Sequence, residues 1–199
     1  MPWSEGQNRR LQQEEKILED YFPNNVNWFN RDGPGTRIEV QMTSNSNKAY
    51  TLRACIQPDY PNSCPDLLVC NPSRPLKDKD GSDLECGTDN HSYGTKDGLT
   101  TICHFVPTMW TNEYTLYQVF MKGRIWLEAY EIYLHTGKPI KTYLREMPAD
   151  GTMESILQAI IARRLLEVLT GLDPDGQQSP TSSSRPPEPE KPKSVCCVM

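Results

Sequence analysis

Apolar and polar residues alternate strictly in two neighbouring segments of the chain, residues 37–42 and 50–56. A period of two residues is typical of a strand with one buried face. Polar residues 43–48 join the two segments, so the pattern predicts an antiparallel hairpin. The apolar residues that share its buried face are Ile38, Val40 and Met42 in the first strand and Leu52, Ala54 and Ile56 in the second.

Three further segments carry apolar residues at spacings of three and four, the period of a helix with one buried side. They are residues 8–20, 113–135 and 152–170. Asn112 is a suitable N-cap for the middle helix, and Gly137 should end it. The chain combines helices with antiparallel strands, so we expect the α+β fold class.

The segment between the hairpin and the middle helix is rich in residues that interrupt regular structure. Pro58, Pro61 and Pro65 lack the N–H that a strand ladder needs. Residues 67–70 are apolar and predict a short buried strand. Residues 71–101 hold so many Pro, Gly, Asp and Asn residues that we expect a long loop, and loops of this length inside a domain are usually functional or disordered.

Length and composition favour a single domain. With 199 residues, 36% of them apolar, the chain has enough material for one good core but not for two. We expect that domain to cover residues 1–171, including the last predicted helix. Residues 172–199 are rich in Pro and Ser and almost without apolar side chains, so we expect a disordered tail.

The charge pattern argues against a nucleic-acid partner. The net charge is −5, and Lys and Arg occur in scattered pairs rather than in a stripe. The first residues lack the basic start and the apolar run of a signal peptide. We therefore expect a cytoplasmic protein, in a compartment that keeps thiols reduced.

The seven cysteines are expected to be free thiols. The five that precede the tail include no C-x-x-C pair, the spacing typical of structural zinc, so we expect no metal and no cofactor. A zinc site assembled through space with His91 and His104 is the remaining alternative. His104 directly follows Cys103, but consecutive residues of a strand point to opposite faces, which argues against a Cys/His dyad between them.

The last four residues, Cys196 to Met199, form a C-a-a-X box. This motif predicts that a prenyltransferase attaches a farnesyl group to Cys196. A single prenyl chain gives only weak, reversible membrane binding. We therefore expect a cytoplasmic protein that associates reversibly with membranes through this lipid anchor. The alternative is a terminal cysteine that occurs by chance and stays unmodified.

Three short motifs follow the leading helix in a fixed order. They are Pro58-Asp59-Tyr60-Pro61 with Pro65 four residues on, then His91, Gly98 and Ile102-Cys103, and then Trp110 followed by Thr115-Leu116 and Val119. In this order they resemble the ubiquitin-conjugating enzyme family over residues 8–136. The resemblance implies an antiparallel meander sheet flanked by helices, to which residues 152–170 would add an extra C-terminal helix.

The chemistry that the resemblance implies is thioester transfer on Cys103. A conjugating enzyme receives the C-terminus of ubiquitin, or of a ubiquitin-like protein, from an activating enzyme and passes it to an amine or to a ligase. A thiolate is strongly nucleophilic, and a thioester keeps enough energy for later aminolysis. His91 would fix the active-site loop, with Tyr93 and Trp110 as supporting residues. Cys86 is the competing thiol, and a small buried core residue is the plainer interpretation of Cys103.

The chain also departs from the family pattern. The Pro-Asn that follows the histidine in the family is replaced by Ser and Tyr after His91. In the family, this Asn is associated with stabilising the oxyanion. Losing such a hydrogen-bond donor lowers the rate by on the order of two to three powers of ten. Tyr93 or Asn90 would have to supply the donor instead. Asn62 and Ser63 replace the apolar residue that many members offer to RING ligases. These departures leave a second function open, a catalytically inactive member of the fold that acts as a lipid-anchored binding module.

Overall fold

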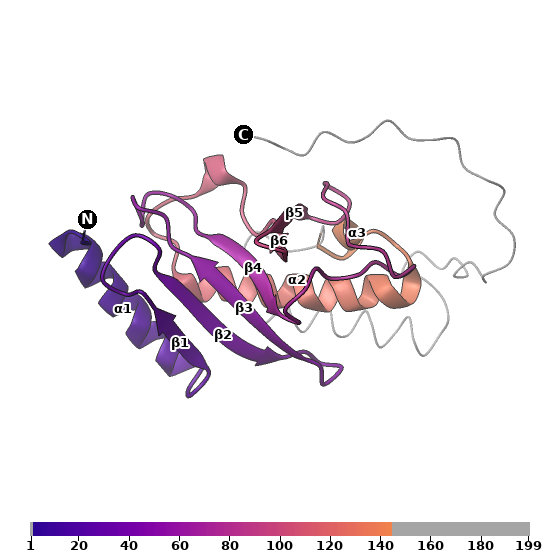
Figure 1. The fold of residues 1–199 in the computed structure, drawn as a ribbon, viewed down its shortest axis with the longest axis horizontal. Helices are drawn as coiled ribbons and strands as arrows, with labels where there is room; N and C mark the ends of the chain where they lie inside the picture. The colour runs from indigo at the N-terminus through magenta and orange to yellow at the C-terminus, as the bar shows by residue number, and fades with distance from the viewer. Residues whose placement is uncertain (1, 145–199) are drawn as a thin grey trace, which may run out of the picture.

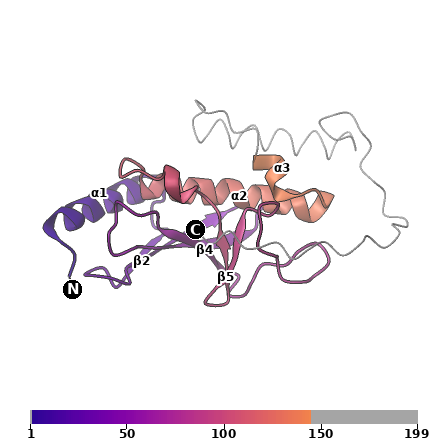
Figure 2. The ribbon, with the colours of Figure 1, turned by 90° about the horizontal axis from the view of Figure 1, so that it is seen from above.

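The computed structural model describes residues 2–144, and the α+β class expected for the chain is confirmed there. The elements are α1 (Glu5–Tyr21), β1 (Val26–Phe29), β2 (Arg37–Thr43), β3 (Ala49–Cys55), β4 (Asp66–Asn71), β5 (Ser92–Lys96), β6 (Leu99–Ile102), the 3-10 helix η1 (Pro107–Met109), α2 (Leu116–Thr136) and α3 (Ile140–Leu144). Within this part of the chain the strands form one antiparallel sheet in the order β1-β2-β3-β4-β6-β5. Figures 1 and 2 show α1 and α2 along the same face of that sheet.

The hairpin predicted from strict alternation is confirmed as β2 and β3. Ile38 pairs with Ala54 and Val40 pairs with Leu52 in antiparallel register. All four side chains are fully buried, as the two-residue period requires for the face that meets the helices.

The long loop expected over residues 71–101 is wrong in its last third. β5 and β6 lie there as a hairpin whose two turn residues are Asp97 and Gly98, both with positive φ (53° and 74°). An Asp-Gly pair suits such a turn because both residues tolerate this backbone conformation. Thr95 and Lys96 are consecutive residues of β5 and both are polar and exposed, so the strand shows no alternation of apolar and polar residues.

Both long helices start at a capping box rather than where periodicity places them. The first was expected from residue 8, but the Ser4 hydroxyl accepts a hydrogen bond from the Gln7 N–H and α1 begins at residue 5. For α2 the expected cap at Asn112 is wrong. The Thr115 hydroxyl accepts from the Gln118 N–H, and the Gln118 side chain accepts from the Thr115 N–H at 2.9 Å, so two helix-end donors are satisfied. The predicted end at Gly137 is confirmed, with this residue at φ 72°.

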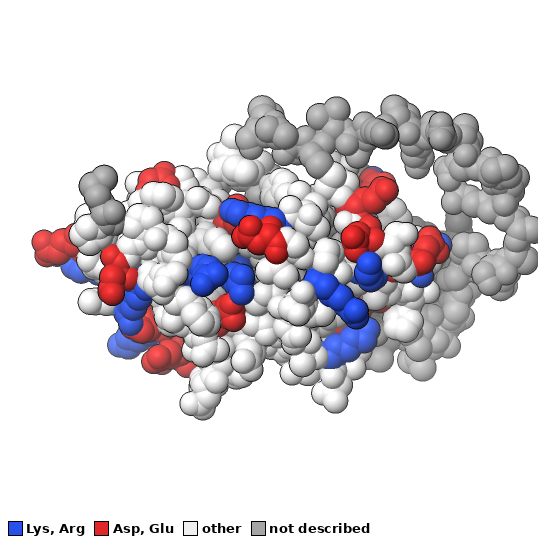
Figure 3. All heavy atoms as spheres, viewed as in Figure 1, with Lys and Arg blue, Asp and Glu red and all other residues white. Residues whose placement is uncertain are grey.

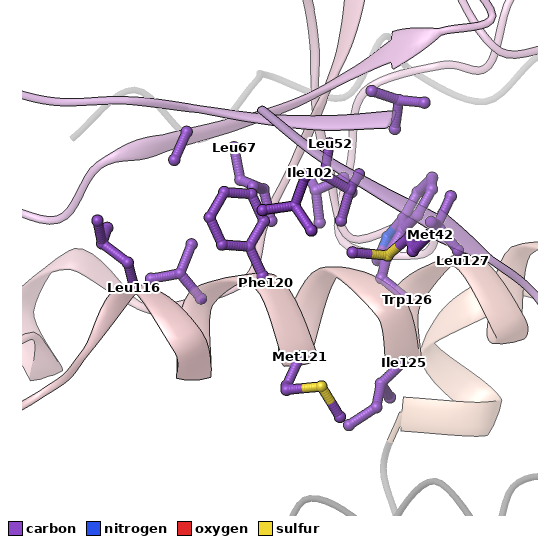
Figure 4. Close-up of a cluster of buried hydrophobic side chains, with 14 of the residues drawn as sticks. Met42, Leu52, Leu67, Ile102, Leu116, Phe120, Met121, Ile125, Trp126 and Leu127 are labelled. Atoms are coloured by element: carbon purple, nitrogen blue, oxygen red, sulfur yellow. The ribbon is translucent and has the colours of Figure 1, made fainter. Parts of the chain in front are cut away.

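The core lies between α2 and the sheet, as Figure 4 shows around Phe120 and Trp126. Gly123 allows the close approach of helix and sheet. A Cβ at this position would meet Leu52 Cδ1 at 2.5 Å and Leu67 Cδ2 at 2.7 Å. This packing fixes α2 under β3, β4 and β6, the last of which leads directly into Cys103.

A buried carboxylate joins the start of α2 to α1. Glu14 is fully buried and accepts hydrogen bonds from Arg10 Nε, the Tyr60 hydroxyl and the Leu116 N–H, each at 2.8 Å. The charge is therefore paired and every contact is a charge-assisted hydrogen bond. The same residues connect the helices to the proline-rich segment that follows β3.

Several predictions lie outside the described residues: the helix over residues 152–170, the domain boundary at 171, the tail over 172–199 and the lipidation site Cys196. Among residues 2–144, none of the helices has the length and hydropathy that a membrane span requires. On the face drawn in Figure 3, Lys and Arg side chains are interspersed with Asp and Glu side chains.

Candidate active site

Cys103 directly follows β6, at the point where the chain leaves the sheet. The strand itself is buried along its whole length, whereas Cys103 is half-buried. The Cys103 N–H donates to the carbonyl oxygen of His91 at 2.9 Å. This bond ties the residue after β6 to the residue before β5, so the thiol is placed by the hairpin on one side and by the sheet on the other.

The Tyr93 hydroxyl contacts the Cys103 thiol. Cys103 Sγ lies 3.2 Å from the hydroxyl oxygen, which in turn donates to the carbonyl oxygen of Phe105 at 3.4 Å. Tyr93 is 38% exposed, so this side chain lies over the thiol at the surface. Of the two residues that could replace the missing Asn, the structure brings Tyr93 to the sulfur. The Asn90 side chain instead donates to the Glu85 carbonyl oxygen at 3.0 Å.

His91 fixes the loop through its backbone. Its carbonyl oxygen accepts from the Cys103 N–H and also from Trp126 Nε1, at 3.0 Å, and its φ of 44° lies in the left-handed region. Burial, and secondarily the charge of Lys141, lowers the pKa of the His91 imidazole from its ordinary value of 6.5. A neutral ring is therefore favoured beside Cys103.

A cavity of about 240 Å³ opens beside the thiol. Its walls combine polar groups with apolar side chains, among them Cys103, His91, Lys122, Val106, Met109 and Trp126. Val106 and Met109 are 54% and 68% exposed, so the apolar wall reaches the surface. The Lys122 ammonium lies 3.5 Å from the centroid of the Phe105 ring, close enough for a cation–π contact.

Trp110 is buried and supports the loop that follows Cys103. Its Nε1 donates to the Pro61 carbonyl oxygen at 2.9 Å, and its ring meets the Phe105 ring edge-on at 5.1 Å. The supporting role expected for Trp110 is thus structural, because its contacts join the proline-rich segment to the residues between β6 and η1.

Sequence reasoning missed a thiol–imidazole pair, Cys64 and His104. His104 Nδ1 lies 3.3 Å from the Ile102 carbonyl oxygen, which can only accept, so Nδ1 carries the proton and Nε2 accepts from Cys64 Sγ at 3.5 Å. The two residues are far apart in sequence, and no local motif signals their contact. They line an adjoining cavity of about 350 Å³ that also includes Asp59 and Asp66, and His104 lines the Cys103 cavity as well.

The Cys64–His104 pair is electrically neutral. Burial, and then the charge of Asp66, raises the pKa of the Cys64 thiol to about 12. Burial lowers the pKa of His104 to about 4. A thiolate and an imidazolium are thus both disfavoured, so the pair is suited to structure rather than to nucleophilic attack.

The other cysteines before the tail offer less than Cys103. Burial raises the pKa of Cys55, and burial followed by the Glu39 charge raises the pKa of Cys70 to about 11. The expectation that every cysteine is a free thiol is wrong for Cys86, which is disulfide-bonded and half-buried in the segment between β4 and β5. As a disulfide, Cys86 cannot act as the competing thiol. Among residues 2–144, no group of three or more His, Cys, Asp or Glu side chains could hold a metal ion.

Comparison of the chain with models of protein families, with curated proteins and with solved structures found no match.

Proposed function

We propose that this protein has a ubiquitin-conjugating-type fold and carries the C-terminus of ubiquitin, or of a ubiquitin-like protein, as a thioester on Cys103. The observation that supports this most is the position of the thiol. Cys103 lies at the end of a buried strand, in the wall of a cavity, with the Tyr93 hydroxyl 3.2 Å from its sulfur. The described thiols whose pKa is raised by burial, Cys55, Cys64 and Cys70, are poorer nucleophiles.

The order of elements also supports the proposal. Strands β1 to β4 follow one another in the sheet as they do in the chain, which makes a meander. The motif over residues 58–61 comes directly after β3, and the Cys103 motif comes before α2. This is the order in which the three motifs resemble the conjugating enzymes.

The loading step is an exchange of thioesters. Cys103 Sγ attacks the carbonyl carbon of the modifier's C-terminal glycine, which arrives as a thioester on the activating enzyme. A new C–S bond forms on Cys103, the old C–S bond breaks, and its electron pair leaves with the activating enzyme's sulfur, which takes up the proton released by the Cys103 thiol. The developing oxyanion needs a hydrogen-bond donor. The Tyr93 hydroxyl accepts from Cys103 Sγ and donates to the Phe105 carbonyl oxygen in the unloaded protein, so it would redirect its proton from Phe105 to the oxyanion. Tyr93 would take the place of the missing Asn in this role.

A loading assay tests the proposal. The full chain is incubated with an activating enzyme, ATP and ubiquitin or a ubiquitin-like protein, and is then resolved with and without reductant. We expect a reductant-sensitive adduct that becomes a reductant-resistant ester, or disappears, in Cys103→Ser. Cys64→Ser is the matched control and should load normally, because that thiol lies in the other cavity. Absence of an adduct on the wild type with every modifier tried would favour the inactive binding module.

We further propose that farnesyl on Cys196 anchors the domain to membranes. The C-a-a-X box alone supports this step. Cell fractionation of the wild type against Cys196→Ser tests it. We expect the wild type in both cytosolic and membrane fractions and the variant in the cytosol, and equal distribution of the two would contradict the proposal.

A further inference from the structure

Lys122 is a half-buried cation in the wall of the cavity that holds Cys103. It projects from α2, and its ammonium group lies 3.5 Å from the centroid of the Phe105 ring. The ion pairs among residues 2–144 use other cations, and none joins Lys122 to a carboxylate. The thiols of Cys64 and Cys103 interact with its charge, and its charge in turn acts on His104.

The surroundings of Lys122 make the ammonium group easier to deprotonate than that of a solvent-exposed lysine. Burial lowers the pKa of Lys122 below its ordinary value, and only the two thiols oppose this change. Lys96 shows the opposite behaviour, because its hydrogen bond to Asp66 raises its pKa. A free amine is the nucleophile in acyl transfer, so Lys122 is a better acceptor than an ion-paired surface lysine.

We infer that Lys122 is the self-modification site of this protein, an internal acceptor to which the acyl group on Cys103 is transferred as an amide. The inference rests on the proposed function, because it needs an acyl thioester on Cys103. The Lys122 amine and the Cys103 thiol line one cavity of about 240 Å³, so the two groups react without a second molecule. Apolar side chains, among them Val106 and Met109, make up most of the remaining wall of this cavity.

The transfer balances without a further reagent. The lone pair of Lys122 Nζ attacks the thioester carbonyl carbon, and a C–N bond forms. The C–S bond to Cys103 breaks, and its electron pair stays on sulfur. One proton passes from the attacking nitrogen to the thiolate. The products are an amide on Lys122 and a free Cys103 thiol, so the transfer consumes one bound modifier and leaves a permanently modified wall of the cavity.

A small acyl donor tests the inference without an activating enzyme. The full chain is incubated with N-acetylglycine benzyl thioester, and the position of the acyl group is followed over time by peptide mass mapping. We expect acyl on Cys103 first and on Lys122 later, at a rate that does not change when the protein is diluted. Lys122 should then carry about a hundredfold more label than Lys96, since the reaction within one cavity replaces a bimolecular one.

Three variants complete the experiment. Lys122→Arg keeps the charge and the contact with Phe105, and its Cys103 thioester should persist longer than that of the wild type. Cys103→Ala should reduce the label on Lys122 to the level of Lys96, and Lys96→Arg should change nothing. Decay of the thioester at one rate in the wild type and Lys122→Arg would overturn the inference. Equal labelling of Lys122 in Cys103→Ala, or no acylation of Cys103 by this donor, would also overturn it.

These outcomes separate the inference from the proposed function. A chain that is loaded by an activating enzyme on Cys103 but never labels Lys122 retains the proposed function and loses the inference. A chain that relays the small acyl group from Cys103 to Lys122 but accepts no modifier from any activating enzyme retains the relay and loses the proposed function.

Discussion

The carbonyl oxygen of His91 accepts a hydrogen bond from the side chain of Trp126 at 3.0 Å, and this bond connects the core to the candidate site. Trp126 lies on α2 and is 1% exposed. The same carbonyl oxygen accepts from the Cys103 N–H. The position of the thiol is therefore set by a buried side chain of the helix as well as by the strand that precedes it.

The first prediction concerns this bond. Trp126→Phe removes the indole donor and leaves the His91 carbonyl oxygen with one partner fewer, while the ring itself becomes smaller. We expect the free energy of unfolding, measured by urea denaturation, to fall by about 2–4 kcal/mol. The matched control is Trp28→Phe, because the Trp28 Nε1 atom has no partner among the described residues. A loss in the control as large as that in Trp126→Phe would show that the indole hydrogen bond contributes nothing.

The second prediction concerns the buried carboxylate of Glu14. Glu14→Gln replaces one acceptor oxygen by a donor that must face Arg10, Tyr60 or the Leu116 N–H. Breaking a buried pair in this way costs about 3–5 kcal/mol, so we expect a clear fall in the free energy of unfolding. Glu5→Gln changes an exposed residue of the same helix and should leave the melting temperature unchanged. Equal melting temperatures for both variants would contradict the role assigned to Glu14.

The third prediction uses two helical glycines with opposite surroundings. A Cβ on Gly123 would overlap with Leu52 and Leu67, so Gly123→Ala should lower stability by about 1–3 kcal/mol. A Cβ on Gly6 meets nothing within 4 Å, and Gly6→Ala should leave stability unchanged or raise it by up to about 1 kcal/mol. Thermal unfolding of both variants checks the sign of each effect. Stabilisation by Gly123→Ala would mean that α2 does not approach the sheet this closely.

The fourth prediction is a pH dependence that His104 causes. Burial lowers the pKa of His104 from 6.5 to about 4, so below pH 6.5 the unfolded chain binds a proton that the folded chain does not bind. The stability contributed by the neutral ring is therefore present above pH 6.5 and lost as the pH falls towards 4. At about 1.4 kcal/mol per pKa unit, the loss is roughly 3 kcal/mol.

Urea denaturation of the wild type and His104→Gln at several pH values tests this effect. The other titrating groups are common to both proteins, so their contributions cancel in the difference. We expect the wild type to lose its advantage over the variant between pH 6.5 and 4. Parallel stability curves over this range would contradict the burial of a neutral His104.

The sequence predicted the elements whose pattern is strictly periodic. The hairpin of β2 and β3 alternates at every position, and the end of α2 is marked by Gly137. The start of α2 was misplaced because Asn112 and Thr115 are both good N-caps. Only Gln118, three residues after Thr115, distinguishes them, since it completes the capping box.

The candidate site was predictable only in part. The Cys103 thiol and the loop with His91 follow from local motifs, but the Tyr93 contact needs the β5–β6 hairpin to form. Hydrophobic alternation could not reveal that hairpin, because β5 has polar residues on both of its faces. The contact of Cys64 with His104 and the place of Lys122 in the cavity depend on tertiary packing, for which the sequence carries no local signal.

The most direct test of the account is to identify the cysteine that carries the modifier. The full chain is loaded with ubiquitin or a ubiquitin-like protein by an activating enzyme and ATP, trapped at low pH, digested without reductant and mapped by mass spectrometry for the modifier's C-terminal remnant. We predict that the remnant is joined through a thioester to Cys103. A remnant on Cys64 or Cys86, with Cys103 unmodified, would contradict the account.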